Sequence, residues 1–190
     1  MRVWTIQPLS ALEDIKISGS FRCDPEKSWN ITKENNLKVY YQWLNQQMIK
    51  TIGPAPDGVT YPVWSWYRWE GENVKPDADS GAFLKRTEDK VLFELEMPAD
   101  RVFLSDFDLW QFVLADGYIP SEEDDEDTID RLDALSPEEY EKEKIKSWSN
   151  VIIDEETQVN FAQATFWEIR REDIVSYEIL TQSEHKLRLS

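Results

Sequence analysis

Apolar side chains recur at steps of three or four residues along one segment in the first third of the chain. This spacing places them on one face of a helix. The members of the stripe are Leu37, Tyr41, Leu44, Met48 and Ile52. Gly53 and Pro54 follow, and this pair ends a helix because proline cannot extend it. We therefore predict a long helix over residues 33–52.

The densest aromatic stretch is residues 61–69, Y-P-V-W-S-W-Y-R-W. Alternation along a strand places Trp64, Trp66 and Arg68 on one face, and Ser65 and Tyr67 on the other. Both faces are bulky. The stretch is therefore either an interior strand covered on both sides or a strand with a ligand on one side. The sequence does not say which face lines a cleft.

Shorter patterns complete the expected fold. Further strands are expected near residues 3–7, 90–96, 102–104, 151–153, 162–169 and 174–180, and further helices near residues 10–19, 105–115 and 136–148. We predict one α+β domain over residues 1–190, with a small mixed, largely antiparallel sheet packed by three to four helices. An acidic, mobile segment is expected at about 121–136, and a frayed tail at about 181–190.

Composition narrows the classes of function. The chain carries a net charge of −17, so phosphates of nucleic acids and anionic membranes repel it. Cys23 is the single cysteine, which excludes an intrachain disulfide and favours a reducing cytoplasm. The first residues lack the apolar run of a signal peptide, and no stretch approaches the ~20 apolar residues of a membrane span. We expect a soluble, cytoplasmic, tryptophan-rich protein.

The few reactive side chains in the sequence also restrict the chemistry that the protein can perform. With one cysteine and one histidine, His185, the chain cannot build a Cys/His zinc site or a Ser-His-Asp triad. It contains no phosphate-binding glycine loop and no nucleophile elbow. No metal or cofactor is evident. Any chemistry must therefore use carboxylates, hydroxyls, amides, arginine, lysine or tyrosine.

Two pairs of polar residues accompany the aromatic stretch and a later strand. Arg68 and Ser65 are suited to a phosphate or carboxylate ligand whose base or sugar stacks on the tryptophans, although an arginine stacked on core rings explains the pair equally well. Asp106 and Asp108 follow a predicted strand. They are candidates for a cation site or a general base, or for the cap of a helix.

Two other strands carry polar residues that share a face. Thr5 and Gln7 lie on one face of the first strand, and Gln163 and Thr165 on one face of a late strand, with Glu168 on the opposite face. A hydroxyl beside an amide fixes a polar ligand, and the plain alternative is an ordinary polar strand edge.

The run Glu122–Asp127 is unbroken acid. Such a run is typical of a solubilising segment. The alternatives are a cation site and a docking surface for a basic protein partner, and the residues leave these interpretations open.

Several motifs resemble an uncharacterised bacterial family known only as a domain of unknown function. They span most of the chain and are Trp4-Thr5-Ile6-Gln7, Tyr61-Pro62-Val63-Trp64-Ser65-Trp66-Tyr67, Leu104-Ser105-Asp106-Phe107-Asp108 with Trp110, Lys146-Ser147-Trp148 and Gln163-Ala164-Thr165-Phe166-Trp167. The resemblance brings no assigned activity.

The order of these motifs is also similar to that of the ADP-ribosyltransferase-like fold. That fold opens with a strand bearing a polar NAD-contacting residue, continues with an aromatic and serine segment, and ends with a strand that carries the catalytic acid. The residues in matching order are Thr5 and Gln7, then Tyr61 and Ser65, then Gln163. The opening Arg or His of that fold is missing. The position of the catalytic acid holds Gln163, with Glu168 five residues on, and the resemblance implies NAD as a ligand.

Two hypotheses of function follow. The first is binding of a nucleotide-like or other small polar ligand in an aromatic cleft, which the resemblance extends to a diverged ADP-ribosyltransferase-like enzyme. It requires Ser65 or Arg68 to meet Gln7 or Gln163 in one concave site. The second is a non-enzymatic interaction module whose acidic surface binds a basic partner. The residues do not decide whether the protein is an enzyme, or its oligomeric state.

Overall fold

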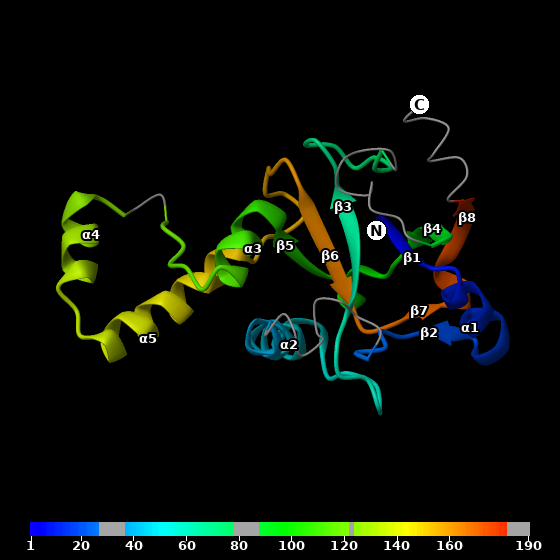
Figure 1. Cartoon of the computed structure of the whole chain (residues 1–190). Coiled ribbons are helices and arrows are strands. Elements are labelled where there is room, and N and C mark those ends of the chain that lie inside the picture. The colour runs from blue at the N-terminus through cyan, green and yellow to red at the C-terminus, as the bar shows by residue number, and fades with distance from the viewer. Residues whose placement is uncertain (27–36, 78–87, 122–123, 182–190) are drawn as a thin grey trace.

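The computed structural model describes residues 1–26, 37–77, 88–121 and 124–181, and it confirms one α+β domain (Figure 1). The strands are β1 (Arg2–Pro8), β2 (Ser20–Phe21), β3 (Val63–Arg68), β4 (Lys90–Glu96), β5 (Phe103–Asp106), β6 (Ala162–Phe166), β7 (Ile169–Arg170) and β8 (Ile174–Leu180). The helices of these described ranges are α1 (Ser10–Ser18), α2 (Lys38–Ile52), α3 (Phe107–Leu114), α4 (Glu126–Asp133) and α5 (Pro137–Ser147).

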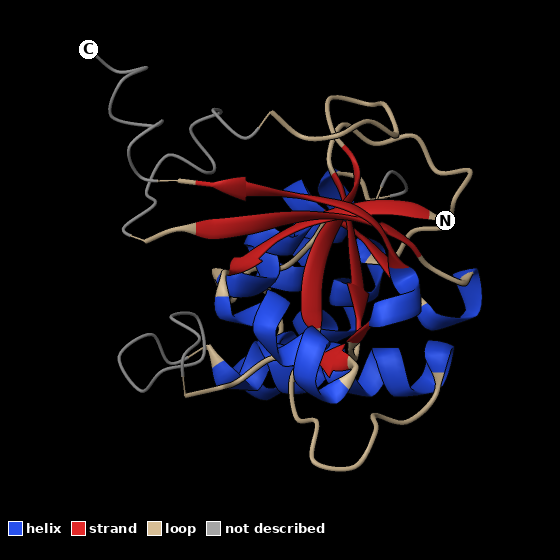
Figure 2. Ribbon diagram, turned by 90° about the vertical axis from the view of Figure 1, so that its right-hand side faces the viewer, coloured by secondary structure: helices blue, strands red, loops and turns tan. Residues whose placement is uncertain are grey.

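Six strands form the main sheet, in the order β5-β6-β3-β1-β4-β8, and each neighbouring pair is antiparallel. The aromatic stretch contains β3, an interior strand between β6 and β1, which is one of the two alternatives that its bulky faces left open. Trp4 pairs with Trp66, and Trp66 pairs with Gln163, so these three side chains share one face of the sheet. Figure 2 shows the strands as a twisted fan with the helical ribbons below it.

Each face of the sheet has its own core. On one face the strands bury Val3, Phe93 and Phe166 against α1 and the small β2–β7 pair. On the other face, Phe103 and Trp64 pack against α2 and α3. Apolar side chains on both sides of the same strands remove water from both surfaces of the sheet.

The acidic region contains a helix that its composition did not predict. Glu126–Asp133 form α4, which begins after Asp125, whose carboxylate accepts a hydrogen bond from the amide of Thr128. Leu132 of α4 is buried, so the segment has an apolar side as well as its acids. In Figure 1, α4 and α5 extend to the left of the sheet as an arm. Mobility of residues 121–136 stays a prediction, and residues 122–123 and the predicted tail from 182 lie outside the described ranges.

The strand expected at 151–153 is reduced to one isolated antiparallel bridge between Ile152 and Ser105. The chain continues from α5 into a 3-10 turn, Trp148–Val151, and the Trp148 indole donates to the carbonyl of Gly117 at 2.8 Å. The first residues of the long helix expected from 33 also lie outside the described ranges. Within those ranges, no helix is both long enough and apolar enough to span a bilayer.

Candidate functional site

The strands β1 and β3 diverge, and this opens a cavity. They share the single register pair Trp4 and Trp66, whereas β1 pairs with β4 along seven positions. Past that pair, the ends of β1 and β3 border a cavity of about 220 Å3, here called the β1–β3 cavity. Its apolar lining is Pro8, Phe21, Pro62, Val63 and Trp64, and its polar lining is Gln7, Ser10, Asp14, Arg22, Cys23 and Asp24.

Two polar residues of β1, Thr5 and Gln7, are hydrogen-bonded to each other, and Thr5 is also bonded to β3. The Thr5 hydroxyl donates to the backbone oxygen of Trp64 at 2.6 Å, and it accepts a hydrogen bond from Nε2 of Gln7 at 2.7 Å. The first bond ties β1 to β3 where the backbone ladder has ended. The second bond fixes the Gln7 amide and leaves its Oε1, which accepts no hydrogen bond from the described residues, as an acceptor for a ligand in the cavity.

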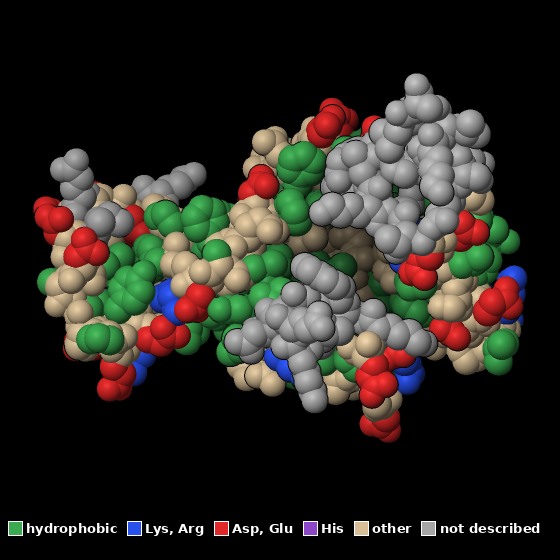
Figure 3. Space-filling model, in the orientation of Figure 1, with side chains coloured by type: hydrophobic (Ala, Val, Ile, Leu, Met, Phe, Trp, Pro, Cys, Tyr) green, Lys and Arg blue, Asp and Glu red, His purple; other side chains and the backbone are tan. Residues whose placement is uncertain are grey.

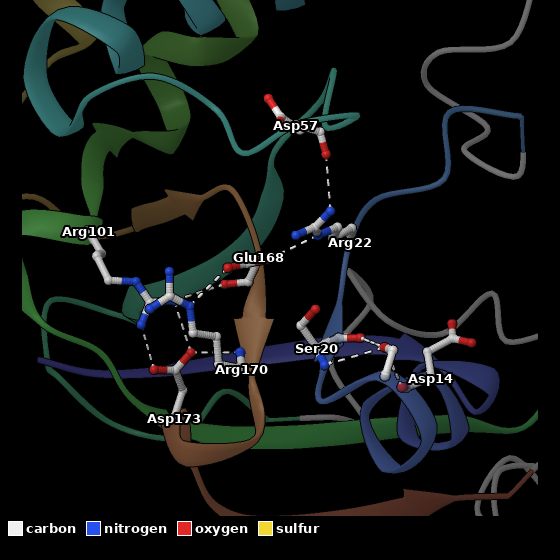
Figure 4. Close-up of polar contacts among 9 residues, drawn as sticks. Asp14, Ser20, Arg22, Asp57, Arg101, Glu168, Arg170 and Asp173 are labelled. Atoms are coloured by element: carbon white, nitrogen blue, oxygen red, sulfur yellow. Dashed lines mark hydrogen bonds and ion pairs between the residues drawn. The ribbon is translucent and has the colours of Figure 1, made fainter.

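Arg22 adds a positive charge to the lining. Its Nε donates to Oε2 of Glu168 at 3.0 Å, and its Nη1 donates to the backbone oxygen of Asp57 at 3.2 Å (Figure 4). Two anchors on different segments hold the guanidinium in place. The cavity therefore combines a fixed amide, a fixed cation and aromatic surface.

Glu168 was a candidate catalytic residue, and it is buried between two arginines. Arg170 donates from Nε to its Oε1 at 2.8 Å, opposite Arg22. Burial alone raises the pKa of this carboxyl, but the hydrogen bonds from Arg170 and Arg22 outweigh it and hold the pKa below its usual value. Glu168 is therefore an ionised partner for cations at neutral pH, which is the wrong state for a general acid.

Cys23 lines the cavity but is not activated. Burial, and to a smaller extent the charge of Asp24, raises the pKa of its thiol to about 11. The reactive form of cysteine is the thiolate, which is scarce at neutral pH in such surroundings. Cys23 is a small apolar wall residue here.

The other predicted residues of the aromatic stretch lie elsewhere. Ser65 is buried and donates to the backbone oxygen of Ala164 at 2.8 Å. Arg68 is buried and donates to the backbone oxygens of Glu155 and Thr157, both at 2.6 Å. The ring of Tyr61 contacts Tyr41 edge to face. The expected meeting of Ser65 or Arg68 with Gln7 in one concave site is not found, because backbone carbonyls on neighbouring segments hold both side chains.

The paired carboxylates have the structural role that the sequence offered as one option. Asp106 is the N-cap of α3, and its Oδ1 accepts from the amides of Asp108 and Leu109 at 2.8 and 3.1 Å. Asp108 lies exposed in the first turn, where its charge suits the helix dipole. Thr165 is fully buried and donates to the backbone oxygen of Phe103 at 3.3 Å.

Gln163 is in an unusual position. It lies on the sheet face opposite Gln7, so the two amides do not meet. Its Oε1, the hydroxyl of Ser105 and Nε1 of Trp64 are buried polar atoms that form no hydrogen bond with the residues that the structure describes. Ser105 and Gln163 are register partners across β5 and β6. Two neighbouring buried groups are therefore both unsatisfied on this face.

Sequence reasoning missed Arg22, Phe21 and the other lining residues from the loop after α1. That loop has no hydrophobic period, so only the pairing of β2 with β7, which the sequence did not suggest, brings it beside Glu168. Among the described residues, no group of three or more His, Cys, Asp or Glu side chains is placed to hold a metal ion.

These features define an α+β protein, with a six-stranded main sheet, whose candidate site is a cavity between diverging strands. Residues 2–175 match the family model described as a domain of unknown function, DUF3841, and the chain belongs to this family. This confirms the expected family. No curated protein and no solved structure matches the chain. The likeness to the ADP-ribosyltransferase-like fold stays a prediction.

Proposed function

We propose that this protein binds a nucleotide-like ligand, or another small polar molecule with a flat ring, in the β1–β3 cavity. The observation that carries the proposal is the combination of the Gln7 amide, the Arg22 cation and the Phe21 ring around one space of about 220 Å3. Ligand sites are concave and mostly apolar, with a few fixed polar groups, and this cavity has that composition.

The size of the cavity limits what enters it. Typical cavities for whole drug-sized ligands measure about 300–1,000 Å3, so about 220 Å3 accepts one ring system and leaves the rest of a larger ligand outside. The Gln7 Oε1 accepts from a ring amide or amino group. Arg22 at the rim then meets the negative charge of a phosphate or carboxylate.

The motif order that is similar to the ADP-ribosyltransferase-like fold makes NAD the first ligand to test. Of the residues in that order, Gln7 lines the cavity, whereas Ser65 is bonded to the Ala164 carbonyl and Gln163 lies on the other face of the sheet. A nicotinamide carries the amide that pairs with Gln7. A diverged ADP-ribosyltransferase-like activity would use this ligand as its substrate.

A thermal-shift screen against NAD and mononucleotides tests the proposal. A ligand that binds only the folded state at about 100 times its Kd adds about 2.7 kcal/mol, which is several degrees of Tm for this size of chain. Gln7→Met keeps the volume and removes the acceptor, so we expect about tenfold weaker binding. Gln47→Met on α2 is the matched control. An absence of any saturable shift, or equal loss in both variants, contradicts the proposal.

The arm of α4 and α5 favours a second candidate, binding of a basic protein partner. The arm projects from the sheet, and acidic side chains lie over its surface at the left of Figure 3. Tyr140 and Ile145 of α5 are exposed beside them, and apolar contacts among charges are typical of interfaces. Deleting Glu122–Asp127 should weaken capture of the partner, and unchanged capture would count against this candidate.

A further inference from the structure

A second, smaller cavity lies on the other side of Glu168. Its volume is about 130 Å3, and Arg101, Arg170 and Glu168 line it together with Trp167, Pro54 and Pro56. We propose that this space, here called the arginine cavity, binds a small oxyanion of the phosphate class, either free or as the terminal group of a larger molecule.

Two guanidiniums, Arg101 and Arg170, and one carboxylate, Glu168, line the arginine cavity. Asp173 is buried and forms a two-pronged pair with Arg101, at 2.8 and 3.1 Å. Glu168, also buried, receives Arg170 on one oxygen and Arg22 on the other. Arg22 itself lines the β1–β3 cavity and not this one. In a chain with net charge −17, two guanidiniums at one cavity offer an anion a local partner against the overall field.

The guanidiniums are held in place and retain unused donors. Arg170 contacts Glu168 through Nε alone, and its two terminal nitrogens form no hydrogen bond with any described residue. Arg101 also approaches the backbone oxygen of Glu168, at 3.4 Å. Figure 4 shows both guanidiniums between Glu168 and Asp173. Because a guanidinium offers five N–H groups in a rigid fork, Arg170 can bind an oxyanion without releasing Glu168.

The volume selects the class of ligand. One water occupies about 30 Å3 of liquid, so about 130 Å3 holds a tetrahedral oxyanion and not a nucleotide. Bidentate contacts to phosphate oxygens are the geometry that arginine favours. The Arg22–Glu168 ion pair separates this space from the β1–β3 cavity, so the inference does not depend on the proposed function.

The test is titration of the whole protein with inorganic phosphate and with methyl phosphate, against sodium chloride of equal ionic strength. Arginine Nε–Hε NMR signals report the site, and calorimetry gives the Kd. We expect saturable binding of one phosphate per chain with a shift of the Arg170 signal. Tighter binding of methyl phosphate indicates a terminal phosphate of a larger molecule, and tighter inorganic phosphate indicates the free ion. Shifts that chloride reproduces would overturn the inference.

Arg170→Gln should weaken phosphate binding about tenfold or more, because it removes a charge-assisted pair of hydrogen bonds. Arg131→Gln on α4, in the distant arm, is the matched control and should bind as the natural chain does. If Arg170→Gln does not fold, Arg170→Lys keeps the charge and loses the fork, and it should bind several-fold more weakly. Unchanged binding in the folded Arg170 variant, or equal loss in the Arg131 variant, excludes the site. NAD binding is measured on the same variants and should persist.

Discussion

On the face of the sheet that carries Thr5 and Ser65, each buried hydroxyl donates to a backbone carbonyl of a neighbouring strand. On the opposite face, the Thr165 hydroxyl also donates to a carbonyl, that of Phe103, but the Ser105 hydroxyl and the Gln163 amide oxygen are buried without a hydrogen bond to any described residue. What differs is whether the fold supplies an acceptor or donor for the side chain.

The difference separates residues that hold the fold from residues that cost it stability. A hydrogen bond contributes about 0.5–1.5 kcal/mol net, whereas a buried polar atom left unpaired costs about 1–3 kcal/mol. Native proteins contain few such atoms. On the face with Thr5 and Ser65, both buried hydroxyls form hydrogen bonds that support the fold around the cavity. On the other face, Gln163 and Ser105 are polar groups that the fold alone does not require.

The largest expected effect concerns the cavity on the satisfied face. With a thiol pKa of about 11 instead of 9.0, Cys23 should react with iodoacetamide at pH 8 about 100-fold more slowly in the native than in the urea-unfolded chain. Because the folded-state pKa is the higher one, the buried thiol adds stability below pH 9 that is lost as pH rises toward 11. Equal labelling rates in the two states would show that water fills the cavity.

The next largest effect is expected for Thr5→Val. The change is nearly isosteric, but it removes both the donor to the Trp64 carbonyl and the acceptor for Gln7. We expect a loss of about 2 kcal/mol in the free energy of unfolding, measured in urea. The control is Thr51→Val on α2, whose hydroxyl bonds to its own helix at an exposed site, and it should lose far less. A similar loss in both variants would show that the hydrogen bonds of Thr5 between β1 and β3 stabilise the fold no more than an exposed hydroxyl does.

The sequence predicts the framework better than the site. Periodicity locates α2, and the aromatic stretch is correctly expected to be an interior strand, because side-chain burial along one element leaves a local pattern. The cavity depends on how far β1 and β3 diverge and on the β2–β7 pair, which are contacts between distant segments. Arg22 has no local signal of its own, and its partner Glu168 is 146 residues away.

A matched pair of serines tests the comparison directly. Ser65 and Ser105 are both buried strand residues, and they differ in that Ser65 donates to a carbonyl and Ser105 does not. Ser65→Ala should therefore lower the free energy of unfolding by about 1 kcal/mol, while Ser105→Ala should leave it unchanged or raise it. Denaturant unfolding with unchanged slope measures both. Destabilisation of equal size in the two variants would show that the faces do not differ.

The smallest effect on the free energy of unfolding is expected for a change at Gln163. Gln163→Met keeps the volume and removes the unpaired amide oxygen, so the free energy of unfolding should rise by up to about 1 kcal/mol. The control Gln7→Met should not raise it, since Nε2 of Gln7 is bonded to Thr5. A stabilised variant would mean that the chain keeps the Gln163 amide at the expense of stability. A destabilised variant would mean instead that the amide contributes to the fold, and its place opposite Ser105 would need no functional explanation.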